Sequence, residues 1–515
     1  MESGQHILSW TPRSLGLRTV LCLLTPFLLT LSFPDFNQFW LAWIALTPLL
    51  LACWGQGVLI AFGLGLLSGF MTMAGICHWI FQVNAFRWYH GLILGLYLGL
   101  YPAVWCGMLS FLRGYRVPFI LAAPTIWVAL DYLKAHAFFL AFPWATLAHS
   151  QHANLPVLQW STLTGEAGIT FLIVLASAAL AEMIAAGKWT GMVSAAAIIL
   201  LVHGWGALQI THSIQGKRVK VAVIQPCISR EERGVAQGRT ESFLRLKQLT
   251  YEVADSQPAL VVWPETAVRN LGKDVDRYEQ IETLARFIGA PILTGASEFG
   301  KFPVRKSLEN RVTGVEQKQF NSAYFITGEG KQAGPYHKWI RVPFAEYVPL
   351  DGILDWPDWL VPERPDVMPG NEYQQYPLGE GLRIGPLICW ENLFAGHVRI
   401  LVNQGNDVIV QLTNDNWFGS TAAPWQHNAA SVLRAVENRV FLVIASNTGP
   451  SQIIDPFGYV TAEISPLFKE GVIIGEVKAK SSETFFTRRG ELFALLCISM
   501  MVTGGCSLPL WRTGV

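Results

Sequence analysis

The sequence predicts a multi-span α-helical membrane domain joined to an α/β sandwich domain of packed layers. Two observations predict this fold class: the distribution of charge along the chain and a change in hydrophobic periodicity after about residue 215. Of the 75 Asp, Glu, Lys and Arg residues in the 515-residue chain, residues 1–214 hold only 12, whereas 215–484 hold 59. Because a bilayer excludes charge, we expect the first region to be embedded in lipid and the second to face water.

The apolar stretches of the N-terminal region are long enough to cross a membrane. A hydrocarbon core of about 30 Å requires roughly 20 apolar residues per helix. Seven spans are predicted before residue 215 and an eighth near the end of the chain: 16–33, 38–54, 57–82, 91–112, 117–134, 167–187, 190–210 and 491–508. The first span is interpreted as an uncleaved helix, because no small-residue cleavage site follows Phe33. The predicted domains are therefore 1–214, 215–484 and 485–515.

The basic residues of the short loops predict the orientation in the membrane. An N-terminus inside the cell places most of them in the cytoplasm: Arg13, Arg18, Arg113, Arg116, Lys188 and Arg512. Seven spans then place residues 215–484 outside, and the eighth returns the C-terminus to the cytoplasm. Arg488 and Arg489 oppose this orientation, since they flank the last span on its outer side.

Beyond Arg218 the apolar residues follow the pattern of strands separated by helices. Strands are expected at 219–225, 259–263, 291–295, 321–326, 382–388, 407–413, 440–446 and 451–454, and a last one begins at Tyr459. Helices are expected at 281–288, 392–404 and 425–438. Strands that first alternate with helices and then follow one another through tight turns indicate a layered α/β sandwich.

Few polar side chains of the membrane region suggest a site. His149 and His152 lack a third ligand nearby, so we expect no metal there. Asp131 and Lys134, three residues apart, form either a polar lining or an interfacial ion pair. Among the eight cysteines, only Cys227 and Cys389 lie outside apolar spans, which gives no disulfide framework.

Three residues near predicted strand ends form a chemically complete set: Glu265, Lys338 and Cys389. Each alone has an ordinary interpretation, as a turn glutamate, a surface lysine or a core cysteine. Together they supply a sulfur nucleophile, a base to take its proton and a cation to stabilise an oxyanion. Cys227 follows Pro226 without a comparable partner set and is interpreted as structural.

The segments around these residues resemble the Glu-Lys-Cys signatures of the nitrilase superfamily, in the same order. They are Trp263-Pro264-Glu265, Tyr336-His337-Lys338 with Pro343-Phe344-Ala345-Glu346-Tyr347, and Ile388-Cys389-Trp390-Glu391. Further matching segments are Asn414-Asp415-Asn416-Trp417-Phe418-Gly419, Arg434-Ala435-Val436-Glu437-Asn438-Arg439 and Ser446-Asn447-Thr448-Gly449. With the membrane spans on both sides, the whole chain resembles the bacterial apolipoprotein N-acyltransferase family, which implies a nitrilase-like α-β-β-α sandwich.

The resemblance implies transfer of an acyl chain from a phosphatidylethanolamine-type phospholipid to the N-terminal amine of a diacylated apolipoprotein. It implies an inner-membrane protein with a periplasmic catalytic domain, and no cofactor, metal or nucleic acid. By motif, Cys389 is the acyl-accepting nucleophile, Glu265 the base and Lys338 the oxyanion-stabilising charge. Supporting positions are Glu346, Glu391, Asn321 and Trp390. Relatives commonly have Tyr at the position of Trp390, and some place a Trp after Gln225 where this chain has none.

The aromatic residues of the second region, and the acceptor of the acyl group, each allow two interpretations. Trp417, Phe418 and Trp425 form either an apolar acyl slot or ordinary packing, and the aromatic segment 351–370 either enters the headgroup region or packs on the protein. The same triad serves a membrane-anchored amidase or hydrolase that passes the acyl group to water. A transporter with an accessory domain is disfavoured, because the predicted spans carry few charges.

Overall fold

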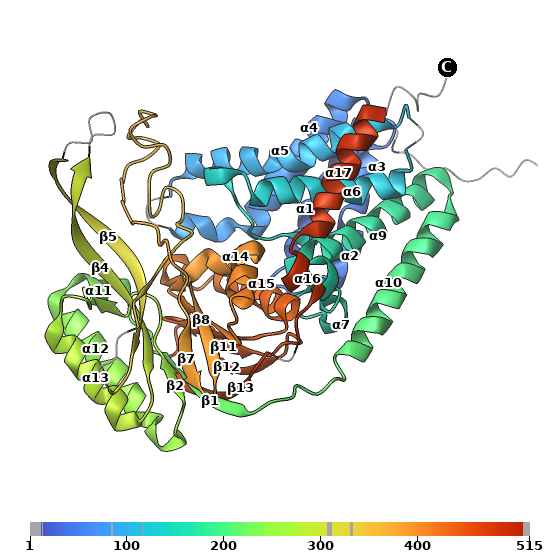
Figure 1. Cartoon of the computed structure of the whole chain (residues 1–515). Coiled ribbons are helices and arrows are strands. Elements are labelled where there is room, and N and C mark those ends of the chain that lie inside the picture. The colour runs from blue at the N-terminus through green and yellow to red at the C-terminus, as the bar shows by residue number, and fades with distance from the viewer. Residues whose placement is uncertain are drawn as a thin grey trace, which may run out of the picture. The chain divides into compact units, whose positions relative to one another are not determined.

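The computed structural model describes residues 12, 14–83, 86–115, 117–305, 312–329, 333–480 and 482–507. The chain divides into two compact units (Figure 1). The helical unit comprises 1–212, 421–437 and 484–515, and the sandwich unit comprises 213–420 and 438–483. The predicted fold class, a helical membrane domain plus an α/β sandwich, is confirmed.

Five helices of the helical unit are long and apolar enough to cross a membrane: α1 (Leu15–Ser32), α4 (Val58–Ile76), α5 (Trp88–Leu112), α9 (Glu166–Ala186) and α10 (Trp189–Gln209). Two shorter helices are α6 (Phe119–Ala135) and α17 (Leu492–Ser507). The predicted positions of Arg13, Arg116, Arg512 and residue 508 lie outside the described residues.

The predicted span 38–54 is divided among η1 (Phe39–Leu41), α2 (Ala42–Ala45) and α3 (Thr47–Cys53). Pro48 lies in the first turn of α3, where its missing N–H costs no hydrogen bond, so a new helix begins there. The predicted span 57–82 leaves α-helical geometry after Ile76 and continues as η2 (His78–Gln82). Short helices complete the unit: η3 (Phe138–Leu140), η4 (Leu147–Gln151), α7 (Leu155–Leu158), α8 (Ser161–Thr164) and α16 (Phe485–Arg489).

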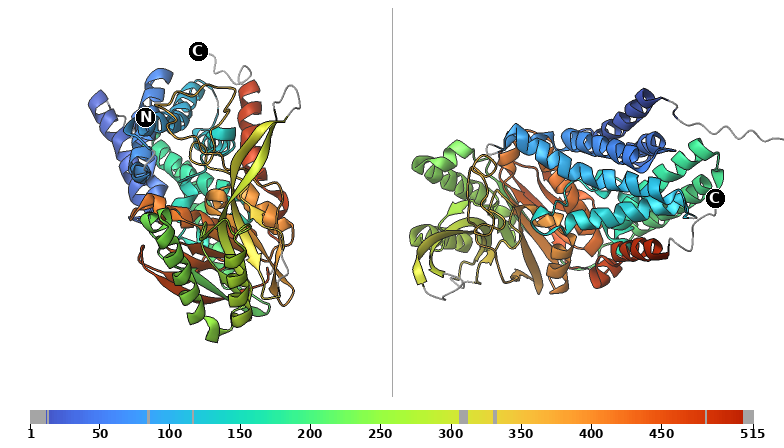
Figure 2. Two further views of the ribbon diagram at one scale, coloured as in Figure 1. Left: turned by 90° about the vertical axis from the view of Figure 1, so that its left-hand side faces the viewer. Right: turned by 90° about the horizontal axis from the view of Figure 1, so that it is seen from above.

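Small residues allow α4 and α5 to pack closely side by side (Figure 2). A Cβ atom added to Gly65 would lie 2.5 Å from the Pro102 carbonyl oxygen, and one added to Gly69 would lie 2.8 Å from Gly99 Cα. Larger side chains would therefore separate the helices, as expected for a small-residue packing motif in membrane helices.

A buried ionic cluster ties helix α15 (Ala423–Asn438) to the other helices of the unit. The fully buried Arg434 Nη2 lies 2.7 Å from Glu166 Oε2, and Arg434 Nε lies 2.9 Å from Glu437 Oε2. His149 Nε2 is 3.1 Å from the same Glu166 oxygen. Arg434 of α15 is thus held by an ion pair to a residue 268 positions earlier in the sequence.

We expect Arg434→Ala to lower the free energy of unfolding by about 3–5 kcal/mol, because it leaves the buried Glu437 and the partly buried Glu166 without their cation. Thermal unfolding of the detergent-solubilised protein measures this loss. Lys188→Ala is the matched control, since the Lys188 side chain is 65% exposed in its pair with Glu182. A melting temperature for Arg434→Ala equal to that of the control would contradict the stabilising role of the cluster.

Two sheets form the sandwich unit. The first has the order β13-β1-β2-β4-β5-β6, with β3 paired to β4, and the second has the order β12-β11-β10-β9-β8-β7. The first contains β1 (Arg218–Gln225), β2 (Leu260–Val262), β3 (Val268–Arg269), β4 (Ile292–Arg305), β5 (Val312–Ile326), β6 (Tyr336–His337) and β13 (Gly471–Lys478). The second contains β7 (Tyr376–Gly379), β8 (Leu382–Ile388), β9 (Val408–Thr413), β10 (Phe441–Ser446), β11 (Ser451–Ile454) and β12 (Val460–Ile464).

Alternate residues of both sheets face each other and form one core. This core includes Val221, Leu293 and Ala323 from the first sheet and Ile388, Val410 and Val443 from the second. Each fully buried aliphatic side chain of this kind contributes about 1.5–3 kcal/mol of transfer free energy. The core therefore fixes the two sheets face to face and positions the strand ends.

Helices α12 (Ala236–Glu252) and α13 (Val275–Ile288) lie side by side and cover the outer face of the first sheet (Figure 1). Their apolar residues Phe243, Leu246 and Ile281 pack against Val261 and Trp263. Helix α14 (Ala395–Asn403) contacts β8 and β9 of the second sheet. Shorter helices of this unit are α11 (Arg230–Gly234), η5 (Ala254–Ser256), η6 (Cys389–Leu393) and η7 (Asp415–Phe418).

The predicted strands at 219–225, 382–388, 407–413, 440–446 and 451–454 agree with the structure to within one residue at each end. Strands β4 and β5 extend well beyond 291–295 and 321–326, because they continue as a long antiparallel hairpin. The sequence of this extension has no regular alternation of apolar and polar residues, so its strands could not be predicted. Helix α12 also has no predicted counterpart, since its sequence is strongly polar.

Candidate active site

Glu265, Lys338 and Cys389 lie directly after three strands of the sandwich unit. Glu265 follows β2 and the buried Trp263, Lys338 follows β6, and Cys389 follows β8. Strands β2 and β6 belong to one sheet and β8 to the other. Packing the sheets face to face therefore brings together groups that are far apart in the sequence.

Cys389 occupies a sharp turn between β8 and η6. Its φ of +55° is in the left-handed region, which is costly for a residue with a side chain and recurs at functional sites. The Cys389 carbonyl oxygen accepts a hydrogen bond of 3.1 Å from Gln411 Nε2 on the neighbouring strand β9. The turn holds the half-buried thiol at the end of a rigid strand.

Two carboxylates surround the buried Lys338 ammonium. Lys338 Nζ donates to Glu346 Oε1 over 2.8 Å and lies 4.0 Å from Glu265 Oε1. Asn321 Nδ2 donates to the same Glu265 oxygen over 2.7 Å. Glu346 Oε2 accepts from the Val342 backbone N–H over 2.7 Å. Glu265 is thus oriented by an amide and a cation, while Lys338 is held in place by Glu346.

Burial controls the protonation of the three groups. Burial raises the pKa of Glu265, Glu346 raises it further, and Lys338 opposes the rise. Burial and the Glu265 charge hold the Cys389 pKa well above its usual value, and Lys338 partly offsets them. Burial works to lower the Lys338 pKa, but Glu346, Cys389 and Glu265 raise it overall. The surroundings therefore favour the thiol form of Cys389, raise the proton affinity of Glu265 as a proton acceptor requires, and favour the charged form of Lys338.

Glu391 anchors the loops that carry the site. Its Oε1 accepts from the Trp339 and Ile340 backbone N–H groups over 2.6 and 3.1 Å. Its Oε2 accepts from the Ile388 N–H and from the Tyr336 hydroxyl, each over 2.8 Å. Burial raises the Glu391 pKa to about 7, although the Ile388 N–H opposes the rise. The side chain connects the loop of Lys338 to the turn of Cys389.

We expect Glu391→Gln to slow acylation of Cys389 and to lower the free energy of unfolding by about 1–3 kcal/mol, because the amide NH₂ would face donors that then lack an acceptor. Thermal unfolding and the rate of Cys389 acylation measure the two effects. Glu380→Gln is the control on the adjacent β7–β8 turn, where the Glu380 side chain is 53% exposed. Unchanged values for Glu391→Gln would show that this carboxylate does not position the site.

Trp390 also connects the two loops. Its Nε1 donates to the Ile340 carbonyl oxygen over 2.7 Å, and its ring meets Phe394 at 5.3 Å between centroids. The side chain is buried. Trp390 therefore contacts the protein on several sides and fits a supporting position.

Asp415 is a neighbour of the site that the sequence argument did not assign a role. It begins η7, directly after β9, and is buried. Its charge acts to raise the pKa values of both Cys389 and Glu265. The sequence pattern that identifies Glu265 and Cys389, a polar residue after a buried strand, also occurs at Asn414-Asp415.

The three aromatic residues of the expected acyl slot differ in their surroundings. Trp417 is 52% exposed in the sandwich unit, and Phe418 follows it in η7. Trp425 lies in α15, and the helical unit includes it. In segment 351–370, Ile353 and Trp359 are exposed, whereas Val361 is buried. For these residues lipid contact and ordinary packing both stay predictions.

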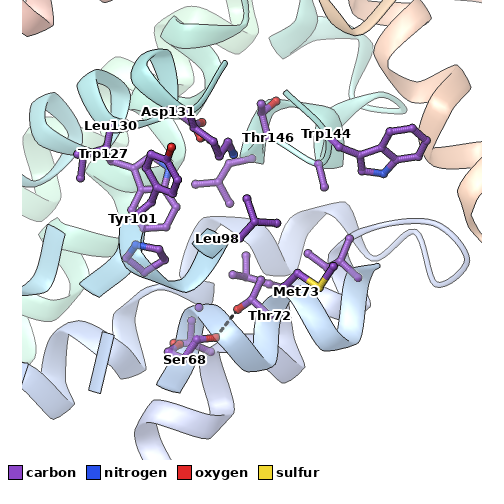
Figure 3. A pocket seen from close by; sticks show the side chains of 18 of the residues that line it. Ser68, Thr72, Met73, Leu98, Tyr101, Trp127, Leu130, Asp131, Trp144 and Thr146 are labelled. Carbon is purple, nitrogen blue, oxygen red and sulfur yellow. Dashed lines mark hydrogen bonds and ion pairs between the residues drawn. The ribbon is translucent and has the colours of Figure 1, made fainter. Parts of the chain in front are cut away.

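Asp131 and Lys134 form an ion pair of 2.8 Å in α6. Both line a cavity of about 110 Å³ within the helical unit, together with Thr72, Leu98 and Tyr101 (Figure 3). The two interpretations of the sequence, a polar lining and an ion pair, therefore both describe this pair. The His149 ring contacts Glu166, and His152 Nδ1 lies 3.2 Å from the His149 carbonyl oxygen. The part of the chain that the structure describes contains no group of three potential metal ligands.

Comparison with known proteins extends over nearly the whole chain. The family model of the apolipoprotein N-acyltransferase N-terminal domain matches residues 26–179, and that of carbon-nitrogen hydrolase matches residues 220–485. A Geobacter metallireducens protein named apolipoprotein N-acyltransferase is 35% identical over 93% of this chain and 93% of its own. A Chlorobaculum tepidum protein of the same name is 27% identical over 93% of this chain and 94% of its own.

Among solved structures, an amidase from Nesterenkonia sp. is 16% identical with a TM-score of 0.38, covering 55% of this chain and 98% of its own. The sequence relatives are more informative, because they include both the spans and the sandwich. The chain belongs to the apolipoprotein N-acyltransferase family.

Proposed function

We propose that the protein transfers an acyl chain from a glycerophospholipid to the N-terminal amine of the diacylglyceryl-cysteine of apolipoproteins. The observation that carries the proposal is the constellation of buried Glu265 and Lys338 with half-buried Cys389 in a chain of this family. The donor is of the phosphatidylethanolamine type, and the acceptor is a diacylated apolipoprotein. Such a reaction completes lipoprotein maturation.

In the first half-reaction Glu265 takes the thiol proton as the Cys389 sulfur attacks an ester carbonyl of the phospholipid. The negative charge that forms on the carbonyl oxygen is stabilised by the Lys338 ammonium. The carbon–oxygen bond to glycerol then breaks, and the leaving oxygen takes the proton from Glu265. The products are a Cys389 thioester and a lysophospholipid.

In the second half-reaction the amine of the apolipoprotein attacks the thioester carbonyl. Glu265 receives a proton from the attacking nitrogen, and Lys338 again stabilises the oxyanion. The carbon–sulfur bond breaks, the sulfur recovers its proton, and an amide is formed. One site thus serves two bulky lipids in turn, which predicts ping-pong kinetics.

The membrane helices serve this reaction by keeping the catalytic domain close to its lipid substrates. Extracting a phospholipid chain into water costs about 0.8 kcal/mol per CH₂, which exceeds 10 kcal/mol for a long chain. We propose that the protein lies in the bacterial inner membrane, with residues 215–484 in the periplasm between the spans of 1–214 and 485–515. Lipid-linked substrates then reach Cys389 without leaving the membrane surface.

Purified protein with labelled phosphatidylethanolamine and a diacylated lipopeptide tests the proposal. We expect label in a triacylated lipopeptide and one lysophospholipid per transfer. Labelled free fatty acid instead would identify the membrane-anchored hydrolase, which passes the acyl group to water. Continued turnover of phospholipid to free fatty acid at a rate that does not depend on lipopeptide would contradict acyl transfer.

A further inference from the structure

Two arginines of α11, Arg230 and Arg233, lie near the site in the sandwich unit: Arg233 close to Glu265, and Arg230 against Trp417. Arg233 Nη1 donates to the Thr266 hydroxyl over 2.7 Å, and Thr266 directly follows Glu265. The Arg230 guanidinium carbon lies 4.5 Å from the centre of the Trp417 ring. Trp417 is two residues from Asp415, whose charge acts on Cys389. Arg233 thus borders the segment of Glu265, and Arg230 contacts the short helix η7 that also contains Asp415.

Neither guanidinium has an ion pair within the described residues. Arg233 Nη2 and Arg230 Nε are buried nitrogen atoms without any hydrogen-bond acceptor. A buried N–H group that lacks an acceptor destabilises the folded protein, and more so when the group is charged. Burial also lowers the Arg233 pKa to about 10, with Glu265 opposing the shift. The pair is therefore poised for an anion that the protein itself does not supply.

The chemistry of arginine and of the proposed donor identifies this anion. A guanidinium presents several N–H donors in one plane and binds phosphate oxygens at two points. In a glycerophospholipid only the three-carbon glycerol separates the phosphate from the reacting esters. A phosphate that approaches Glu265 would be repelled by its carboxylate, and Arg233 beside Glu265 offsets that repulsion.

We propose that Arg233 and Arg230 bind the phosphate of the donor phospholipid while Cys389 attacks its ester. This inference rests on the proposed function and adds the group that distinguishes a phospholipid from a neutral glyceride. The exposed Trp417 ring supports the Arg230 guanidinium by a cation–π contact.

The test compares dioleoylphosphatidylethanolamine with dioleoylglycerol as acyl donors for Cys389, in detergent micelles and without acceptor. These donors share acyl chains and esters and differ only in the phosphate headgroup. Intact-protein mass spectrometry follows thioester formation for the wild type and for Arg233→Gln, Arg233→Lys and Arg230→Gln. Arg286→Gln is the matched control, because the Arg286 side chain is 64% exposed on α13.

We expect Arg233→Gln to lower kcat/KM for the phospholipid by roughly tenfold to a hundredfold, mainly through KM, as charge-assisted hydrogen bonds are lost. With dioleoylglycerol, the rate of Arg233→Gln is expected to stay within about twofold of the wild-type rate, because this donor has no phosphate for Arg233 to bind. Arg233→Lys retains charge and recovers part of the loss, and Arg230→Gln shows a smaller loss of the same kind.

Equal losses with both donors would assign Arg233 to the positioning of Glu265 and overturn the phosphate site. An unchanged phospholipid rate in both glutamine variants would also overturn it. A wild-type protein that is acylated by neither donor would instead refute the proposed function. Thermal unfolding shows whether each variant folds, and Arg230→Gln tests the site without altering the contact to Thr266.

Discussion

Replacing Cys389 with serine is expected to abolish acyl transfer, by roughly a thousandfold or more in kcat/KM. A serine hydroxyl is much less acidic than a thiol, so Glu265 cannot provide the same nucleophile. The site also surrounds Cys389 with the carboxylates of Glu265 and Glu346, which further disfavour an alkoxide. Lysophospholipid release from labelled phosphatidylethanolamine measures the loss.

Cys227→Ser is the matched control for this substitution. Cys227 is the other cysteine between residues 215 and 484, it is partly exposed, and burial raises its pKa. We expect this variant to retain wild-type transfer. Transfer by Cys389→Ser at a rate near that of Cys227→Ser would contradict the assignment of Cys389 as nucleophile.

The second large effect is expected for Glu265→Gln, which preserves the shape of the side chain and removes the base. General-base catalysis contributes about 10²- to 10⁴-fold, and both half-reactions use this carboxylate. Thioester formation and its aminolysis are therefore both expected to slow by a factor in this range. Rapid-quench measurement of each half-reaction separates the two rates. A defect in aminolysis alone would show that another group takes the proton of Cys389.

The pH dependence provides an independent test of the same base. Burial raises the pKa of Glu265 above its ordinary value, so the carboxylate is lost at a higher pH than for an exposed glutamate. Acylation by the wild type is therefore expected to fall as the pH decreases through this raised pKa. The residual activity of Glu265→Gln is expected to lack this acidic limb. An acidic limb that persists in the variant would assign the titration to another group.

The positions of the nucleophile and the base could be predicted because each follows an apolar strand, whereas Lys338 follows the short, partly polar strand Tyr336–His337 and is identified only by its motif. Glu265 and Cys389 each mark an abrupt change after a buried apolar strand. Such a change is visible in sequence, since buried strands give continuous apolar runs. The same signal at Asp415 was not assigned a role, because an aspartate after a strand is also a common turn residue.

Contacts between distant segments could not be predicted in this way. The periodicity of 425–438 predicted helix α15, but it does not reveal that Arg434 pairs with Glu166. Likewise, the strongly polar segment that contains Arg233 gives no periodic signal, and its contact with Thr266 depends on the packing of α11 beside the first sheet. Pro48 marks a break in the span 38–54, yet proline also occurs within intact helices such as α5.

The central claim is that Cys389 carries the acyl chain, and intact-protein mass spectrometry tests it most directly. The protein is incubated with phosphatidylethanolamine in the absence of lipopeptide, and the adduct is mapped by peptide fragmentation. We predict one acyl group on Cys389, which hydroxylamine removes and which lipopeptide discharges into product. An adduct on another residue, or transfer to lipopeptide without any acylated intermediate, would contradict the account.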